Sequence, residues 1–307
     1  MAVSSFIQPD PSAARQIRAF AWGGAGLVVC FAGVLARLGQ FALKGEFNSY
    51  VLLVPVIAAG LVWARWKRNA EFSEPNRALA LALLAAGILT FGFSWMGRTS
   101  YAGWPTSRLI LATLSFVVLL TGFAAWFLGR RFFHTIAFPL GFLVCMVPLP
   151  PVAVAAIDRF LQFASAWVAA VFFQISGLPV FQRGELDFQL PGVTLEVAPE
   201  CSGIQSSLAL FIVSLAAGYV FLRSPWKRAL LSLVVIPLGI ARNAVRILTI
   251  GELCVHFGPE MIHSYLHRKG GWIFFLAALL PFLALLLFLV RLERPVPEKN
   301  RPIEGTP

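Results

Sequence analysis

Eight apolar segments, each long enough to cross a lipid bilayer, constrain the fold of this chain more than any other feature. A transmembrane helix takes about 20 mainly apolar residues, and such segments lie at 19–36, 49–64, 78–97, 107–127, 132–150, 204–222, 229–250 and 271–290. Of the 307 residues, 58% are hydrophobic and 13% are charged, whereas soluble domains average about 45–50% apolar and about 25% charged residues. We therefore predict an all-α polytopic membrane protein with about eight transmembrane helices.

The basic residues, which give the chain a formal net charge of +11, gather in short runs beside the apolar segments. These runs lie at 65–68, 130–131, 223–228 and 291–301. If residues 1–18 are cytoplasmic and eight segments cross, every run falls on the cytoplasmic side, as the positive-inside rule requires. The same distribution argues against nucleic-acid binding, because the charge marks the loops between spans.

The segment 152–177 is also apolar and long enough to cross, but it carries Asp158, Arg159 and Gln162 on one side. If it crossed, the later basic runs would face outward. We therefore predict an interfacial or re-entrant amphipathic helix here, although the sequence alone leaves open whether it crosses.

Apolar and polar residues then alternate on both sides of Pro191-Gly192, which predicts a small extracytoplasmic β-hairpin. The predicted organisation is a cytoplasmic tail (1–18), a five-helix membrane portion (19–150), the extracytoplasmic helix and hairpin (151–203), a three-helix catalytic portion (204–294) and a disordered cytoplasmic tail (295–307).

Three polar residues from different elements reach the same depth in this topology. Residues 202–222 rise through roughly 30 Å, one hydrocarbon core, which puts Cys201 at the outer edge. Arg246 lies 17 residues along the next helix from Ala229, roughly 26 Å back toward that edge. His267 lies about one turn before the last span begins at Gly271. The topology therefore predicts that Cys201, Arg246 and His267 meet at the outer face.

Each of these residues also has a plain interpretation. Cysteine in a membrane helix often behaves as a small apolar residue, Arg246 could be an interfacial anchor, and His267 could be a loop residue. Against this, a helix N-terminus and a nearby cation both activate a thiol. Arg242 and Asn243 can share one helix face with Arg246, because residues three and four apart are neighbours.

Two other classes of protein stay open at this point. In a transporter, Arg242 and Arg246 would bind an anionic substrate within the helix bundle. In a metal protein, zinc or copper would take ligands from a His/Cys cluster. That cluster comprises Cys254, His256, His263 and His267, with Glu252 and Glu260 as possible additions.

At "ECSG", "NAVR" and "HRKGGW" the chain resembles the exosortase/archaeosortase family of membrane-embedded cysteine transpeptidases. The resemblance implies Cys201 as nucleophile, Arg246 as the catalytic arginine and His267 as the catalytic histidine. Arg242 is a second candidate for the arginine. Neighbouring residues with supporting roles would be Arg242, Asn243, Glu200, Ser202, Gly203 and His263. In "FNSYVLLVP", where many exosortases carry a histidine, this chain has Val51 or Leu52.

The resemblance further implies a multi-pass enzyme of the bacterial inner membrane, with its active site at the periplasmic face and with no cofactor or metal. Its partners would be secreted proteins that carry a PEP-CTERM-like signal, in which a motif such as Pro-Glu-Pro precedes an apolar span and a basic tail. The sequence leaves open the recognition motif, the acceptor, whether the product is transferred or hydrolysed, and the oligomeric state.

Overall fold

The structure is a computed structural model that describes residues 11–44, 50–66, 73–96, 104–197, 202–263 and 270–293. The chain divides into two compact units, Met1–Val154 and Ala155–Pro307, with the division inside a long helix. Helices make up almost all of the regular structure, and large apolar side chains are exposed on the outside of most of them. Such outward apolar surfaces suit a lipid environment, so the predicted all-α membrane architecture is confirmed.

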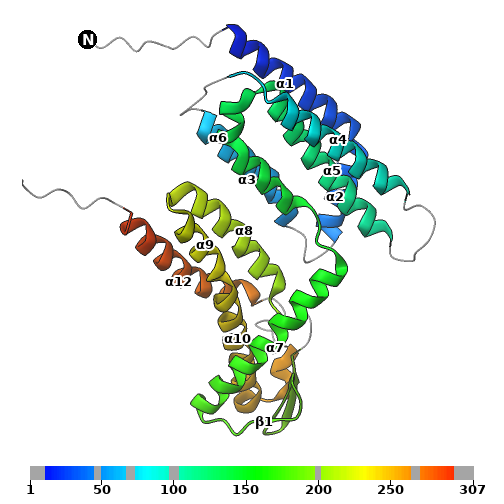
Figure 1. Ribbon diagram of the computed structural model, residues 1–307. Helices are drawn as coiled ribbons and strands as arrows, with labels where there is room; N and C mark the ends of the chain where they lie inside the picture. Colours follow the sequence, from blue (N-terminus) through cyan, green and yellow to red (C-terminus); the bar gives the residue numbers. More distant parts are fainter. Residues whose placement is uncertain are drawn as a thin grey trace, which may run out of the picture. The chain divides into compact units, whose positions relative to one another are not determined.

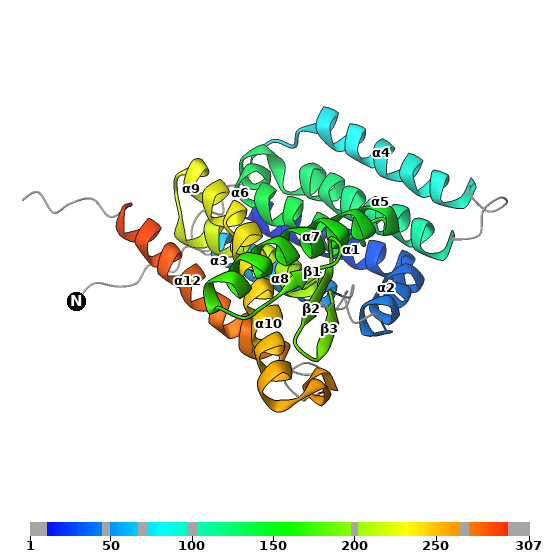
Figure 2. The same ribbon diagram turned by 90° about the horizontal axis from the view of Figure 1, so that it is seen from below.

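The first unit is built from short and long helices only. They are α1 (Pro11–Cys30), α2 (Ala32–Lys44), α3 (Tyr50–Trp66), α4 (Arg77–Met96), α5 (Trp104–Phe127), α6 (Gly129–Phe142) and the 3₁₀ turn η1 (Leu143–Met146). Helices α4 and α5 run side by side (Figures 1 and 2) because Gly87 and Gly122 admit leucine side chains from the facing helix. The Ser115 hydroxyl also donates to the Gly87 carbonyl across this interface at 2.8 Å. Small residues and hydroxyl groups are the usual means by which membrane helices pack closely.

Two predicted spans of the first unit are not continuous helices. The span 19–36 is a pair, α1 and α2, that bends by 67° at Phe31. The Phe31 ring is buried against Phe91 and Phe116, with centroids 5.1 and 5.6 Å away, and this contact fixes the bend. The span 132–150 is also wrong as drawn, because α6 ends at Phe142 and tightens into η1 before the Pro148–Pro151 segment.

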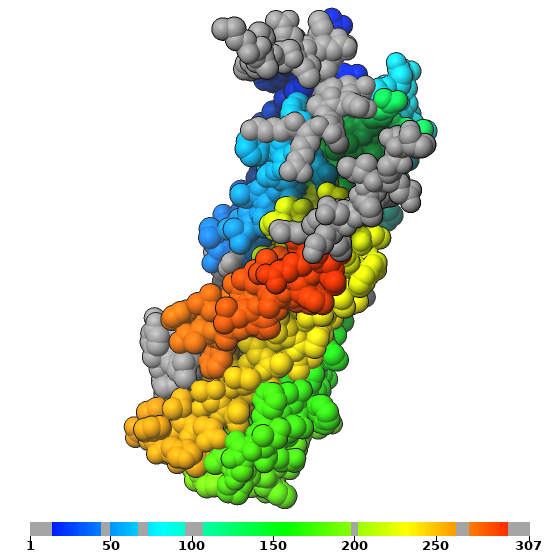
Figure 3. Space-filling model, turned by 90° about the vertical axis from the view of Figure 1, so that its left-hand side faces the viewer, coloured from blue at the N-terminus to red at the C-terminus, as the bar shows by residue number. Residues whose placement is uncertain are grey.

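The second unit contains the small sheet and the remaining helices. They are the greater part of α7 (Pro151–Ser176), β1 (Phe181–Gln182), β2 (Asp187–Leu190), β3 (Val193–Glu196), α8 (Ile204–Phe221), α9 (Pro225–Leu233), α10 (Val235–Phe257), η3 (Pro259–His263) and α12 (Gly271–Arg291). Helix α12, coloured orange to red, lies against α9 and α10 in the space-filling view (Figure 3). A cluster of leucine, valine and phenylalanine side chains from α8, α9, α10, α12 and the adjoining Leu222 forms the core between them.

Helices α9 and α10 form one candidate span, Pro225–Phe257, that is 33 residues long and contains a break at Val234. Pro237 explains the break, since a proline ring clashes with the carbonyl four residues before it, here that of Leu233. Helix α10 ends at Phe257, seven residues beyond the predicted end at 250.

In total, six described helices or helix pairs are long and apolar enough to cross a membrane, and the bent α1–α2 pair would make seven. The six include α7, which is one uninterrupted helix of 26 residues and not a re-entrant pair. Its length and composition suit a span, and its polar residues Asp158 and Gln162, joined by a 3.1 Å hydrogen bond, lie on one side of it.

The sheet has three antiparallel strands where the alternation predicted two. The predicted hairpin is present as β2 and β3, with Leu190 opposite Val193 across the turn. The additional strand β1 pairs Phe181 with Gln189, but its two residues are too few for any alternation to be visible in the sequence.

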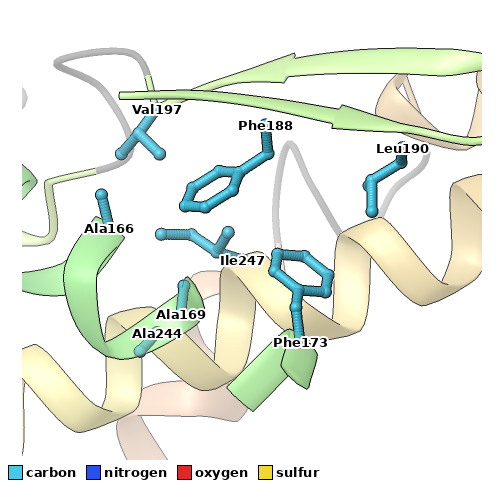
Figure 4. Packing of buried hydrophobic residues seen from close by; sticks show 8 residues of the cluster. All are labelled: Ala166, Ala169, Phe173, Phe188, Leu190, Val197, Ala244 and Ile247. Carbon is cyan, nitrogen blue, oxygen red and sulfur yellow. The ribbon is translucent and has the colours of Figure 1, made fainter. Parts of the chain in front are cut away.

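One face of this sheet packs onto α7 and α10 (Figure 4). Phe188 of β2 lies against Phe173 of α7, with ring centroids 5.5 Å apart. Gly251 of α10 permits this packing, because a Cβ there would lie 2.6 Å from the Phe173 ring. The sheet is thereby fixed to α10, and Val197, the residue that follows β3, is only 3% exposed.

Two residues after the C-terminal end of α12, Glu293 joins this helix to the start of α9. Its carboxylate accepts the backbone N–H groups of Arg223 and Ser224 at 2.7 and 2.9 Å, and the Lys227 ammonium lies 3.7 Å away. The hydrogen bonds from Ser224 and then Arg223 lower the pKa of Glu293 to about 2. Like a helix-capping side chain, this carboxylate accepts backbone N–H groups at the N-terminus of α9. It also places a negative charge there, where the helix dipole favours it.

We expect Glu293→Gln to lower the unfolding temperature of the protein at pH 7 by a few degrees. The folded pKa lies below the ordinary value of 4.5, so the contribution is fully present above about pH 4.5 and is lost as the pH falls through about 2. Thermal melts followed by tryptophan fluorescence at pH 7 and pH 3 should therefore show a smaller difference between wild type and variant at pH 3. Glu196→Gln, at an exposed carboxylate of β3, is the control. A difference that does not change with pH would contradict the assignment.

Candidate active site

The start of α8 has an unusual backbone geometry two residues after the predicted nucleophile. Gly203 is the N-cap residue and has φ +72°, in the left-handed region. Its carbonyl accepts three hydrogen bonds, from the Ser207 N–H at 3.1 Å, the Ser206 hydroxyl at 3.0 Å and the Arg242 guanidinium at 3.1 Å. One backbone oxygen therefore joins the first turn of α8 to a buried cation on α10.

Arg242 is held inside the protein and is 9% exposed. Its Nη2 atom lies so close to Gly203 that a Cβ on that glycine would overlap it. A guanidinium is costly to remove from water unless it is hydrogen-bonded, and the Gly203 carbonyl supplies such a bond. Glycine at position 203 is thus required both by the backbone conformation and by the neighbouring arginine.

Helix α10 comes equally close to α8 three residues earlier. A Cβ on Gly239 would lie 2.5 Å from the Ser207 hydroxyl oxygen. The two contacts, Ser207 with Gly239 and Gly203 with Arg242, show that α8 and α10 run antiparallel at this point. In that register, Arg246, one turn beyond Arg242, extends past the start of α8 toward the side from which the chain enters.

Two buried polar groups at this junction lack partners within the described part of the chain. They are the Asn243 amide nitrogen, on a side chain 1% exposed, and the Ser207 hydroxyl. A buried polar group without a hydrogen bond costs about 1–3 kcal/mol, so such groups call for an explanation in function or in further contacts. Ser207 and Gly239 were missed by the sequence reasoning, although Gly239 stands three residues before Arg242 and thus on the same helix face.

The structure places the predicted site residues as follows. Arg242, Asn243, Ser202 and Gly203 lie together at the α8–α10 junction, and Arg246 is half-buried one turn along α10. His263 ends η3, and only its backbone is described. Cys201, Glu200 and His267 lie outside the described residues.

The segment that carries Cys201 is attached at both ends to buried residues. Val197, at the end of the sheet, is 3% exposed and donates its N–H to the Leu186 carbonyl at 3.0 Å. Ser202, at the start of α8, is 2% exposed, and its hydroxyl accepts the Ile204 N–H at 3.4 Å. Only the four residues 198–201 join these two fixed points.

Within the described residues, Cys254 and His256 of the alternative metal cluster lie in different surroundings. Cys254 is buried in α10, whereas His256 is exposed beside Glu252, its Nδ1 atom 2.9 Å from the Glu252 carbonyl oxygen and 3.4 Å from the carboxylate. Among the described residues no group of three or more histidine, cysteine or acidic side chains is arranged to hold a metal ion.

The fold and the junction together define a polytopic helical membrane protein in which a buried arginine holds the start of a helix beside a cysteine-containing segment. A family model described as transmembrane exosortase matches residues 43–284, which is more than half of the chain, and the chain therefore belongs to the transmembrane exosortase family. Comparisons with curated proteins and with solved structures returned no match.

Proposed function

We propose that this protein is a cysteine transpeptidase that cleaves C-terminal sorting signals of secreted proteins at the periplasmic face of the bacterial inner membrane. Membership of the exosortase family supports this proposal. The observation that carries it is the hydrogen bond from Arg242 to the Gly203 carbonyl. Cys201 is separated from this anchored glycine by one residue in the sequence.

The proposed chemistry proceeds through a thioester. The Cys201 thiolate attacks the carbonyl carbon of the scissile peptide bond, and His267 takes the thiol proton and returns it to the departing amine. The acyl group then remains on sulfur until an acceptor amine, or water, attacks it and releases the thiol. A membrane-inserted sorting signal suits this site, since its scissile bond would lie just outside its own apolar span.

The two arginines take different parts in this proposal. Arg242 is a positioning residue, because it is engaged with the Gly203 carbonyl and fixes the start of α8. Arg246, one turn farther along α10, stabilises the oxyanion of the tetrahedral intermediate. The buried Asn243 amide would be a second donor to the same oxygen.

The test is a processing assay with a membrane-inserted reporter that carries Pro-Glu-Pro, an apolar span and a basic tail. Cells that contain the protein should convert this reporter to a shorter form, and added hydroxylamine should appear in the product as a C-terminal hydroxamate. A reporter of unchanged length would count against the proposed function, whereas a shortened product without hydroxamate would indicate hydrolysis in place of transfer.

This assay, together with Cys201 alkylation and the unfolding temperature, should distinguish the roles of Arg242 and Arg246. Arg246→Gln should slow processing on the order of 10²–10³-fold and should slow alkylation of Cys201 at pH 7, because the nearby cation is lost. Arg242→Lys keeps its charge but loses the planar fork, so it should lower the unfolding temperature while Cys201 alkylation stays near the wild-type rate. If Arg246→Gln processes normally and Arg242→Lys loses processing with an unchanged unfolding temperature, the two roles are reversed.

A further inference from the structure

The last strand of the small sheet lies at the edge of the sheet and leads into the segment that carries Cys201. The strand order is β1-β2-β3, so β3 pairs with β2 on one side only. Residues 197–200 separate Glu196, the last residue of β3, from Cys201. An edge strand presents a row of N–H and C=O groups with which another extended chain can pair. The free edge of β3 is therefore a candidate binding surface for a peptide.

The register of the hairpin decides which backbone groups face this edge. In an antiparallel pair, opposed residues alternate between those that bond to each other and those that do not. The Val197 N–H donates to the Leu186 carbonyl at 3.0 Å, so Val197 belongs to a bonded pair. Glu196, opposite Asp187, is then in a pair that does not bond, and so is Thr194 two residues earlier. The N–H and C=O groups of Thr194 and Glu196 therefore point away from β2.

This edge is accessible and unprotected. Thr194 and Glu196 are both exposed, and within the described ranges no hydrogen-bond partner lies on this side of β3. Proteins commonly protect an edge with proline, lysine or a very short strand. The sequence of β3, Val-Thr-Leu-Glu, contains neither proline nor lysine, whereas the opposite edge, β1, has only two residues. A peptide can therefore pair more extensively with β3 than with β1.

The packing beneath the sheet holds this edge in place. Phe188, the partner of Leu195 across the hairpin, is fully buried against Phe173 of α7 (Figure 4). Val193 and Leu195 of β3 pack partly buried against the same cluster of side chains. A strand that is already ordered loses little conformational entropy when it binds a peptide. The edge is thus a preformed surface for an extended chain.

The charge of the outward face helps to decide which chain occupies the edge. Asp187 and Glu196 oppose each other across the hairpin, and their side chains alternate with those that face α7 and α10. A second copy of this protein, pairing through its own β3, would add another Glu196 to this acidic face, and like charges on neighbouring strands are destabilising. This favours a different occupant from a second copy.

A substrate, in contrast, has to bring an extended segment to Cys201, five residues beyond Glu196 in the sequence. The residues after its scissile bond would enter its apolar span. The segment before the scissile bond is therefore the part that lies outside the membrane and is free to pair with the sheet.

We propose that β3 binds the substrate by strand addition. The segment before the scissile bond lies along the free edge as a fourth strand, and its main-chain groups bond to those of Thr194 and Glu196. Such pairing takes its affinity from the main chain of the peptide, so the substrate class is a locally extended segment. The inference rests on the proposed function and adds to it how the sorting signal is held.

The test uses the membrane-inserted reporter and the full-length protein with proline in β3. Thr194→Pro removes an N–H that faces the free edge and keeps the ladder to β2, since proline is tolerated at such edge positions. At limiting reporter, processing should fall about tenfold, the order expected for one lost hydrogen bond. Raising the amount of reporter should restore processing, and alkylation of Cys201 should stay at the wild-type rate. Thr194→Ala keeps the N–H and should lose much less.

Gln182→Pro is the matched control at the opposite edge of the same sheet. The Arg183 N–H donates to the Asp187 carbonyl at 3.1 Å, so the N–H of Gln182, one residue earlier, faces away from β2. This variant should process the reporter like wild type. It also loses the 3.2 Å hydrogen bond from the Gln182 side chain to the Glu185 carbonyl, so the unfolding temperatures of both proline variants should be compared.

Photo-crosslinking locates the bound peptide directly. In Cys201→Ala protein, p-benzoylphenylalanine in place of Thr194 should crosslink to the uncut reporter, and the same group in place of Gln182 should not. Equal processing by Thr194→Pro and Gln182→Pro, or a crosslink from position 194 only to a second copy of the protein, would overturn strand addition and leave the proposed function standing. If wild type leaves the reporter uncut, the proposed function fails. A crosslink from position 194 to the reporter would then still support the pairing, and its absence would overturn both.

Discussion

Replacing Cys201 by alanine should abolish conversion of the reporter to its shorter form while the protein remains in the membrane at its normal level. The reason is that the proposed reaction has its covalent step at this sulfur, and removal of a nucleophile typically costs on the order of 10⁴-fold or more in rate. Immunoblots of the reporter and of the membrane fraction measure both quantities in the same cells.

The other cysteines provide matched controls for this experiment. Cys30 is exposed on α1 and Cys254 is buried in α10, and alanine at either position should leave processing close to wild type. Normal processing by Cys201→Ala would remove the cysteine mechanism, and loss of processing in Cys254→Ala alone would turn attention to the metal interpretation.

The second large effect is expected for Gly203→Ala. A residue with a Cβ costs roughly 1–2 kcal/mol in the left-handed conformation, and at this position the new methyl group also meets the Arg242 guanidinium and lies 3.7 Å from the Asn243 side chain. Arg242 must therefore move, and with it the start of α8. We expect processing to fall on the order of 100-fold, as displacements of about 1 Å in an active site do.

Gly177→Ala separates the two contributions. Gly177 has φ +78°, but nothing lies within 4 Å of a Cβ built there, so this variant carries the backbone strain without the clash. Both variants should lower the unfolding temperature, and only Gly203→Ala should lose processing in addition. Equal processing by the two would show that the contact between Gly203 and Arg242 has no part in activity.

The long spans were predictable because hydropathy alone defines them. Helices α4, α5, α8 and α12 begin and end within about three residues of the predicted segments. The breaks within the helices were harder to predict from the sequence. Pro237 is a visible signal for the one at Val234, but the 67° bend at Phe31 depends on aromatic contacts with α4 and α5 that are distant in the sequence.

The candidate site was predictable in composition but not in register. Helical spacing placed Arg242 and Asn243 on one face, and the structure brings both to Gly203. The register between α8 and α10 decides which arginine contacts the start of α8. The close approach of Ser207 to Gly239 sets this register, and no local sequence pattern encodes that contact. The depth argument for Cys201 and His267 stays a prediction, since both lie outside the described residues.

The attachment of Glu293 to the start of α9 has a mechanical consequence for the far end of α12. A helix of 21 residues is about 31 Å long and behaves as a stiff rod over that length. Two backbone hydrogen bonds and a lysine at Glu293 stop this rod from sliding along its own axis. The position of Gly271 along the axis of α12 is thereby set by contacts at the opposite end of the helix.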